Sequence, residues 1–277
     1  MKSIEEMLER IKIPNEVQYT QHTSKYDPPE KNTSSTCYAR IESGIFIKEK
    51  IRSYDKTIWE FYMLWLYDKI FEKVNKKNRH LKIKIKIPTP KGIEWSEEKN
   101  LRLNMEFLTG LPIKKYSEKS REYINGKEIK INKKKLNIIT SIAFALGVFD
   151  RIKTHYLLFH GDIDFRHVMY DPEKLMLGIV DFEKAFIYVP GCGIDRETVE
   201  KAITHEREKI IANLSDKFSH LEGFGKILYF FEKGERSPRL KNIKIENYVK
   251  KFFEKYNFIP KPPQSVLERI KEAAEKY

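Results

Sequence analysis

The sequence has few cysteines and no long apolar run, and both features narrow its class. Among 277 residues there are two cysteines, Cys37 and Cys192. They lie far apart and form no CxxC pair, so they indicate neither a disulfide framework nor a structural zinc site. A reducing, cytoplasmic location is therefore expected. No stretch of about 18 consecutive apolar residues occurs, so we expect no transmembrane helix and no membrane partner.

Glycine is also scarce, with 12 residues in the chain. Gly191 and Gly193 in GCGID are not followed by the helix pattern of a dinucleotide fingerprint, so we do not expect a dinucleotide-binding fold. Three histidines, His155, His160 and His167, have spacings that do not place them on one helical face. Because no cysteine accompanies them, a zinc cluster is not indicated.

The chain is rich in aromatic and basic residues. Hydrophobic residues make up 40% and aromatic residues 13%, which is enough to bury a core. There are 53 basic and 40 acidic residues, and the pI of about 9.4 favours anionic partners, including RNA or the ribosome. The same lysine-rich, glutamate-rich composition is also typical of proteins from high-temperature organisms.

The first hundred residues have the pattern of a small β-rich lobe with one helix. A short helix is expected at Ile4–Ile11, where acidic residues argue against a signal peptide. The segment CYARIESGIFIKEK predicts two strands that turn at residues 42–44. Asp55 is expected to cap a helix with a strong apolar stripe. HLKIKIKIP and LRLNMEF each predict a further strand.

The second part of the sequence is mostly helical. Residues 113–135 form a basic, insertion-like segment in which Asn125-Gly126 favours a hairpin turn. Helical periodicity begins near Leu136, and IENYVKKFFEKY predicts another helix. Ser265 and Glu268 are expected to form the capping box of the final helix. The fold class expected from these patterns is α+β.

The segment FHGDIDFRHVMYD joins this pattern to a chemical function. Apolar YLLF before it and LMLGIV after it predict short strands, and each strand leads to an aspartate. Asp162 and Asp181 are nineteen residues apart, enough for a strand pair that returns the chain and brings the two carboxylates together. One carboxylate can accept the proton of an attacking hydroxyl while the other holds Mg²⁺ against nucleotide phosphates. The pair therefore suits phosphoryl transfer.

HGD followed by a strand pair and DFE resembles the catalytic and metal loops of the protein-kinase-like superfamily. The resemblance is to the branch that contains aminoglycoside phosphotransferases, choline kinases and RIO kinases. It implies a catalytic loop at residues 160–167, with Asp162 as the catalytic base. It also implies a metal loop at residues 181–183, with Asp181 as the Mg²⁺ ligand.

The same resemblance extends to three elements upstream. IFIK supplies Lys48 as the phosphate-binding lysine, and Glu60 is its expected partner, although Lys50 is an alternative to Lys48 and Glu60 has an alternative as a solvent-facing charge. LNMEFLTGLP resembles the hinge of the phosphotransferase branch. There the backbone of Glu106, Phe107 and Leu108 is implied to bind adenine.

The implied architecture is a bilobal protein-kinase-like fold with a small antiparallel β-rich N-lobe and a larger α-rich C-lobe. The N-lobe covers residues 1–103, the hinge residues 104–110 and the C-lobe residues 111–277. The implied function is ATP- and Mg²⁺-dependent transfer of a γ-phosphate to a hydroxyl-bearing small molecule or protein. The basic segment 113–135 is expected to line the acceptor cleft.

Two departures from the family pattern keep alternatives open. KNTSST stands where the family has a glycine-rich phosphate loop, and His167 stands where the family has a metal-binding asparagine. His167 is expected to replace that second metal ligand, although imidazole suits Mg²⁺ less well than an amide oxygen. The alternative function is a catalytically weak or inactive kinase-like protein that binds nucleotide or RNA. A purely basic nucleic-acid module is a third hypothesis, but no RRM or OB motif is present.

Overall fold

The computed structural model describes residues 37–50, 54–96, 100–118 and 131–277. The helix expected at Ile4–Ile11 and the turn expected at Asn125-Gly126 lie outside these ranges. The described chain divides into two compact units. The first comprises the described residues up to 69 together with 88–108 and 244–263, and the second comprises 70–87, 109–243 and 264–277. The described residues form small antiparallel and mixed sheets together with several helices, which is compatible with the α+β class.

The first unit contains an antiparallel sheet with strand order β1-β2-β5-β4. Its strands are β1 (Cys37–Glu42), β2 (Ile45–Lys50), β4 (Pro90–Trp95) and β5 (Leu101–Glu106). Ser43 and Gly44 join β1 to β2 with φ values of 49° and 76°. A two-residue hairpin turn of this kind needs positive φ at both positions, which explains why the chain turns where the sequence predicts.

Two helices contribute to the part of the first unit that the structure describes. They are the first part of α2 (Tyr54–Lys77) and the whole of α7 (Ile245–Tyr256). The ring of Phe252 on α7 lies 4.6 Å from Tyr62 and 5.4 Å from Trp65 of α2, measured between centroids. These edge-to-face contacts use the apolar stripe that predicts α2 from sequence. Asp55 lies within the first turn of α2 and not before it, so it is not the N-cap that the sequence predicts. Its negative charge instead interacts favourably with the positive end of the helix dipole.

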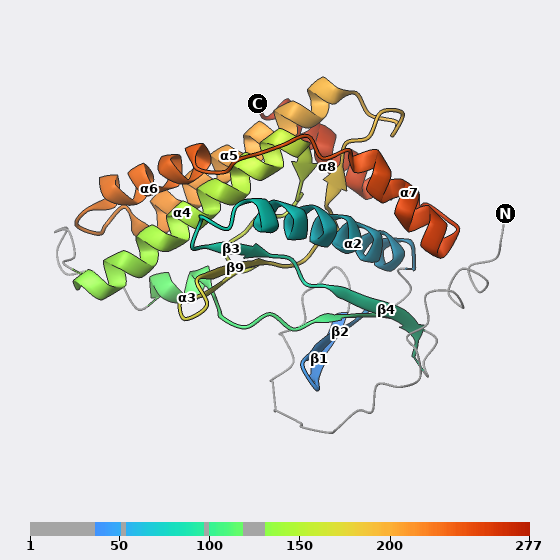
Figure 1. Ribbon diagram of the computed structural model, residues 1–277, viewed down its shortest axis with the longest axis horizontal. Helices are drawn as coiled ribbons and strands as arrows, with labels where there is room; N and C mark the ends of the chain where they lie inside the picture. Colours follow the sequence, from blue (N-terminus) through green and yellow to red (C-terminus); the bar gives the residue numbers. More distant parts are fainter. Residues whose placement is uncertain (1–36, 51–53, 97–99, 119–130) are drawn as a thin grey trace. The chain divides into compact units, whose positions relative to one another are not determined.

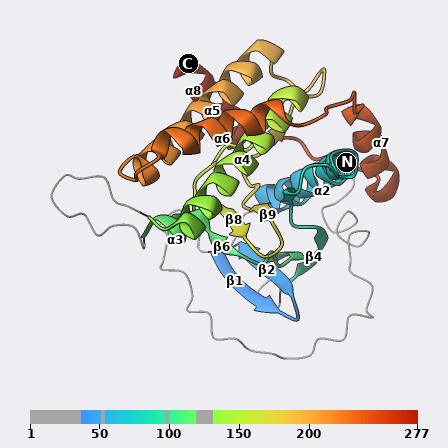
Figure 2. The same cartoon turned by 60° about the vertical axis from the view of Figure 1, so that its left-hand side comes forward.

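The second unit contains a four-stranded sheet with order β3-β9-β8-β6 and a short ladder of β7 with β10. The strands are β3 (Lys84–Lys86), β6 (Leu111–Pro112), β7 (Leu158–Phe159), β8 (Val168–Asp171), β9 (Met176–Ile179) and β10 (Phe186–Ile187). β8 and β9 form an antiparallel hairpin, side by side in Figure 2. β3 runs parallel to β9, so the HLKIKIKIP segment pairs with a strand about ninety residues later in the chain.

Five helices lie wholly among the described residues of the second unit. They are α3 (Ile113–Glu118), α4 (Lys133–Tyr156), α5 (Arg196–Phe218), α6 (Phe224–Arg236) and α8 (Gln264–Glu275). Asn132 caps α4 by accepting a hydrogen bond from the amide of Lys135. The capping box predicted for the last helix is wrong, because α8 already begins at Gln264, whose side chain donates to Glu268 at 3.1 Å.

Helices α4 and α6 pack closely because each presents a glycine to the other (Figure 1). A Cβ added at Gly147 of α4 would lie 2.0 Å from the carbonyl oxygen of Phe231. A Cβ added at Gly234 of α6 would lie 2.1 Å from the carbonyl oxygen of Phe144. Real side chains do not approach a backbone oxygen so closely, so the two glycines set the distance between the helices.

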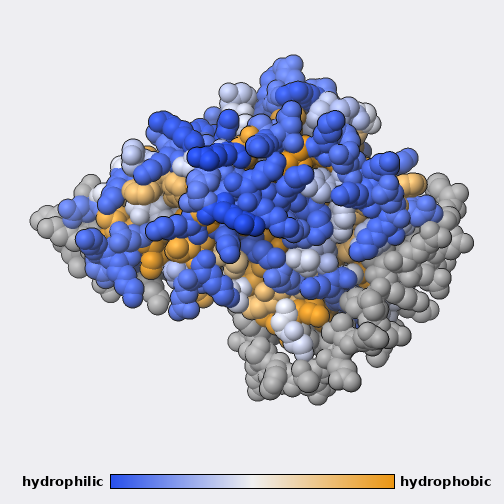
Figure 3. All heavy atoms as spheres, viewed as in Figure 1, coloured by the Kyte–Doolittle hydropathy of each residue, from blue (hydrophilic) through white to orange (hydrophobic). Residues whose placement is uncertain are grey.

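One face of the molecule shows the distribution of hydrophilic and apolar residues. The face in Figure 3 is mostly hydrophilic, with small and scattered apolar areas. Within the ranges that the structure describes, no helix is long and apolar enough to cross a membrane.

We expect Gly234→Ala to lower the free energy of unfolding by at least about 2 kcal/mol, because the new methyl group must push α4 and α6 apart. Gly225→Ala in the same helix is the matched control. A Cβ at Gly225 meets nothing within 4 Å, so higher helix propensity should leave stability unchanged or raise it by up to about 1 kcal/mol. Urea unfolding of both variants measures the difference, and equal effects would contradict this account of the packing.

Candidate active site

The two aspartates predicted to act in catalysis lie on neighbouring loops of the second unit. Asp162 follows β7, and Asp181 follows β9. The buried ring of His160 joins the loops, since its Nε2 lies 3.1 Å from the carbonyl oxygen of Val180. Burial lowers the pKa of His160, so the ring is uncharged at neutral pH. Its role is to connect the two loops by a hydrogen bond.

Asp162, His167 and Asp181 bring their side chains together. One ligand atom from each lies within 4.8 Å of the other two, and Nε2 of His167 is 3.6 Å from Oδ2 of Asp181. Nδ1 of His167 is 3.0 Å from the backbone oxygen of Asp162. A carbonyl oxygen can only accept, so Nδ1 must carry the hydrogen, and in the neutral ring Nε2 presents its lone pair toward Asp181.

This donor set fits a divalent cation. Metal-binding histidines usually donate a hydrogen bond from the N–H of their second ring nitrogen to a carbonyl or carboxylate oxygen, and Nδ1 of His167 has such a partner in Asp162. Two carboxylates suit Mg²⁺, and the added imidazole makes the set equally suitable for Mn²⁺. Asp181 has a φ of 66°, a conformation that non-glycine residues seldom adopt. Such strain often occurs at functional sites, where the surrounding structure must maintain it.

Glu206 of α5 anchors the loop that carries Asp162, and the sequence analysis did not identify it. This buried carboxylate accepts hydrogen bonds from the backbone amides of Gly161 at 2.6 Å and His160 at 3.1 Å. It also accepts one from the ammonium group of Lys153 at 2.9 Å. Burial disfavours its charge, but Lys153 and the other donors outweigh burial and hold the pKa of Glu206 below its usual range.

A signal for Glu206 exists in the sequence. The buried positions of α5 recur at helical spacing, and one acidic residue interrupts this apolar series: Val199, Ala202, Ile203, Glu206, Ile210, Leu214 and Phe218. An acid in a buried stripe must find hydrogen-bond donors. The sequence could therefore have marked Glu206 as important, but not the loop that it binds.

Gly161 is held from two further directions. Nε of Arg269 on α8 donates to its carbonyl oxygen at 3.0 Å. Its φ is 83°, and an added Cβ would lie 2.3 Å from the backbone oxygen of Lys184. Glycine is therefore required between His160 and Asp162.

The other two aspartates of FHGDIDFRHVMYD, Asp164 and Asp171, have different surroundings. Oδ1 of Asp164 accepts hydrogen bonds from the backbone amide and Nε of Arg166, at 2.8 and 3.1 Å. Asp171 accepts from the hydroxyl of Thr109 at 2.7 Å and from the backbone amides of Glu173 and Lys174. Asp171 thus organises the turn between β8 and β9.

In the first unit, the structure joins Lys48 to Glu60. Nζ of Lys48 on β2 lies 2.9 Å from Oε1 of Glu60 on α2, and Glu60 is buried. Glu49 has the opposite orientation along the strand and binds Arg102 at 2.8 Å. The side chain of Lys50, the alternative to Lys48, is outside the described set.

The expected adenine-binding segment ends β5. The amide of Glu106 donates to the carbonyl oxygen of Thr89 at 2.9 Å, and the amide of Phe107 donates to that of Gly44 at 3.0 Å. Both amides are used within the protein. A nucleotide at this segment would therefore have to use the remaining backbone groups of Glu106–Leu108.

The start of the basic segment 113–135 contacts the candidate catalytic loop. The amide of Lys114 in α3 donates to the carbonyl oxygen of Phe165 at 3.2 Å. Residues 119–130 lie outside the described ranges. The structure places the start of the segment beside the candidate catalytic loop, and the role of the segment at an acceptor cleft stays a prediction.

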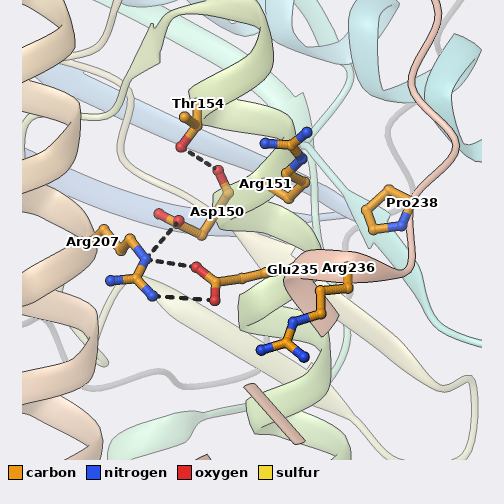
Figure 4. A pocket seen from close by; sticks show the side chains of 7 residues that line it. All are labelled: Asp150, Arg151, Thr154, Arg207, Glu235, Arg236 and Pro238. Carbon is orange, nitrogen blue, oxygen red and sulfur yellow. Dashed lines mark hydrogen bonds and ion pairs between the residues drawn. The ribbon is translucent and has the colours of Figure 1, made fainter. Parts of the chain in front are cut away.

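A cavity of about 560 Å³ lies elsewhere in the second unit, between α4, α5 and the end of α6. In Figure 4 the guanidinium group of Arg207 faces the carboxylates of Asp150 and Glu235. Its Nε lies 2.6 Å from Oε1 of Glu235 and 3.9 Å from Oδ2 of Asp150. Asp150 is 1% exposed, and burial raises its pKa to about 6. The neighbouring Glu235 also raises that pKa, whereas Lys153 and Arg207 lower it.

No family model and no curated protein matches the chain. One solved structure with a weak likeness is the bifunctional kinase-methyltransferase WbdD, with 12% identity and a TM-score of 0.35. The match covers 78% of this chain and 47% of that one, so the chain spans about half the length of WbdD. A likeness this weak carries no argument about the fold or the activity of this chain.

The pKa of Asp150 predicts a pH-dependent stability. The folded protein binds this proton more tightly than the unfolded chain does, since the pKa rises from 3.8 to about 6. This group therefore makes the folded state less stable as the pH rises from about 4 to about 6, by about 3 kcal/mol in total. Asp150→Asn should remove that loss. We expect the unfolding free energy of the variant, relative to wild type, to increase across this interval in urea titrations. Parallel pH profiles would contradict the assignment.

Proposed function

We propose that the protein is a metal-dependent phosphotransferase that moves the γ-phosphate of ATP to a hydroxyl acceptor. The observation that supports this most is the convergence of Asp162, His167 and Asp181, whose ligand atoms lie within 4.8 Å of one another. One carboxylate from each of two adjoining loops is the arrangement that phosphoryl transfer needs, because one binds cation and the other receives a proton.

The roles follow from the surroundings of each side chain. Asp181 and His167 hold the divalent ion, Mg²⁺ or Mn²⁺, which when bound neutralises charge on the nucleotide phosphates. Asp162 orients the acceptor hydroxyl and accepts its proton. Glu206 and Arg269 keep Asp162 in position by binding the backbone before it.

The first unit supplies the residues for nucleotide binding in this proposal. Lys48 holds the α and β phosphates, and Glu60 orients it through their 2.9 Å contact. The segment Glu106–Leu108 binds the adenine edge through those backbone groups that are not already used. Together these roles correspond to the bilobal kinase-like fold that the sequence motifs resemble.

The acceptor is a hydroxyl-bearing small molecule or protein. The contact of Lys114 with Phe165 supports a role for the basic segment 113–135 beside the acceptor. The strong positive charge of the chain is compatible with an RNA-associated or ribosome-associated acceptor.

A second function, nucleotide binding without catalysis, is favoured by one observation. The position expected to hold a metal-binding amide is occupied by His167, which Mg²⁺ accepts less readily. The two functions differ in turnover. A binding protein would retain metal-dependent ATP affinity and release no ADP.

We expect purified protein to release ADP from ATP slowly in the presence of Mg²⁺ or Mn²⁺, with water or the protein itself as acceptor. Asp162→Asn should lower this rate by about 100-fold or more, since a general base is typically worth about 10²–10⁴. ADP release followed by a coupled assay, and autophosphorylation followed with labelled ATP, measure the effect.

Asp164→Asn is the matched control. It changes the same residue type two positions away and can still accept the amide of Arg166. This variant should retain wild-type turnover. Metal-dependent ATP binding without turnover in the wild type would favour the binding function, and absence of any ATP binding would exclude both.

A further inference from the structure

We propose that Lys184 is a further catalytic residue, which contacts the phosphoryl group during transfer; this inference rests on the proposed function. Lys184 directly follows the DFE motif, and the sequence motifs gave it no role. In the structure its Nζ lies 3.3 Å from Oδ2 of Asp162, although the two residues are far apart in the chain. An ammonium group therefore stands beside the proposed general base.

The backbone of Lys184 is held firmly in this position. Its carbonyl oxygen and Cβ lie 2.3 and 2.6 Å from where a Cβ on Gly161 would be. The following amide, that of Ala185, donates to the carbonyl oxygen of Phe182 at 3.1 Å. Phe182 and Ala185 are both fully buried. The chain after DFE is thus packed against the chain before Asp162, and the Lys184 side chain starts from a fixed point.

The ion pair itself adds little to folding. The side chain of Lys184 is 46% exposed and that of Asp162 is 25% exposed, so water screens their attraction. The position of Lys184 next to Asp162 is better explained by a contact with the phosphoryl group that the substrate brings.

The basic side chain of the candidate catalytic loop itself is already paired. Arg166 is the one arginine or lysine within residues 160–167, and its Nε is bound to Asp164 at 3.1 Å. Lys184 lies on the neighbouring loop, and its ammonium group contacts Asp162 and not Asp164. A fixed cation at the point where a phosphoryl group meets the base can stabilise charge that develops in the transition state.

The chemical step balances without any change in Lys184. The acceptor oxygen forms a bond to the γ-phosphorus, the bond from that phosphorus to the β,γ-bridging oxygen breaks, and ADP leaves with the electron pair. The acceptor proton passes to Asp162. Lys184 stays protonated and donates a hydrogen bond to a non-bridging oxygen of the transferred group. Without an acceptor, water takes its place and the products are ADP and phosphate.

The test compares Lys184→Met with Lys201→Met. Lys201 on α5 is a close match, since its side chain is 47% exposed and its Nζ pairs with Glu197 at 2.9 Å. We expect Lys184→Met to lower kcat for ATP turnover by about 100-fold, as loss of one transition-state donor typically does, with KM for ATP changed less than about threefold. Lys184→Arg should recover part of the loss, and Lys201→Met should behave as wild type.

A binding measurement supplies a readout other than turnover. ADP with aluminium fluoride imitates the phosphoryl group in transfer, and calorimetry gives its affinity separately from that of ADP. Lys184→Met should weaken binding of the aluminium fluoride complex by about 100-fold and leave ADP binding unchanged. Thermal unfolding confirms that the variant is folded.

The outcomes separate this inference from the proposed function. If wild type turns over ATP and binds the aluminium fluoride complex, but Lys184→Met and Lys184→Arg do so equally well, the role of Lys184 is wrong and the proposed function stands. If wild type neither turns over ATP nor binds the complex, both are overturned.

Discussion

The candidate site depends on the hydrogen bonds that the buried carboxylate of Glu206 accepts. Glu206 lies within α5 and receives the amides of His160 and Gly161 together with the ammonium group of Lys153. The buried negative charge of Glu206 is tolerated because three donors surround it. Loss of one partner leaves the remaining buried polar groups without full hydrogen bonding. The loop before Asp162 therefore cannot move without exposing Glu206 to an unfavourable environment.

The remaining geometry of the site follows from that anchor. Once Gly161 is fixed, its left-handed backbone allows the chain after DFE to pack directly against it. This contact brings Asp162 next to Lys184, while the ring of His160 bonds to Val180 and sets the distance to the second loop. The fold thus places these charged groups through contacts of their backbones.

Sequence patterns predicted those parts of the structure that depend on local order. The β1–β2 hairpin follows from its turn residues, and Lys48 with Glu60 follows from the order of motifs. The roles of Glu206 and Arg269 could not be predicted, because both act on Gly161 from helices distant in sequence. The pairing of β3 with β9 could not be predicted for the same reason, because the two strands lie far apart in the sequence. Helix starts were also missed, since a good capping residue does not show whether its predecessor is already helical.

The most direct test of the metal-centred account is pulsed electron paramagnetic resonance on Mn²⁺ bound with ATP. Coupling to ¹⁴N reports an imidazole ligand, and coupling to ³¹P reports the nucleotide phosphates on the same ion. We expect both couplings in the wild type, and loss of the imidazole ¹⁴N coupling alone in His167→Asn. A wild-type spectrum identical to that of Mn²⁺ and ATP in buffer would contradict it.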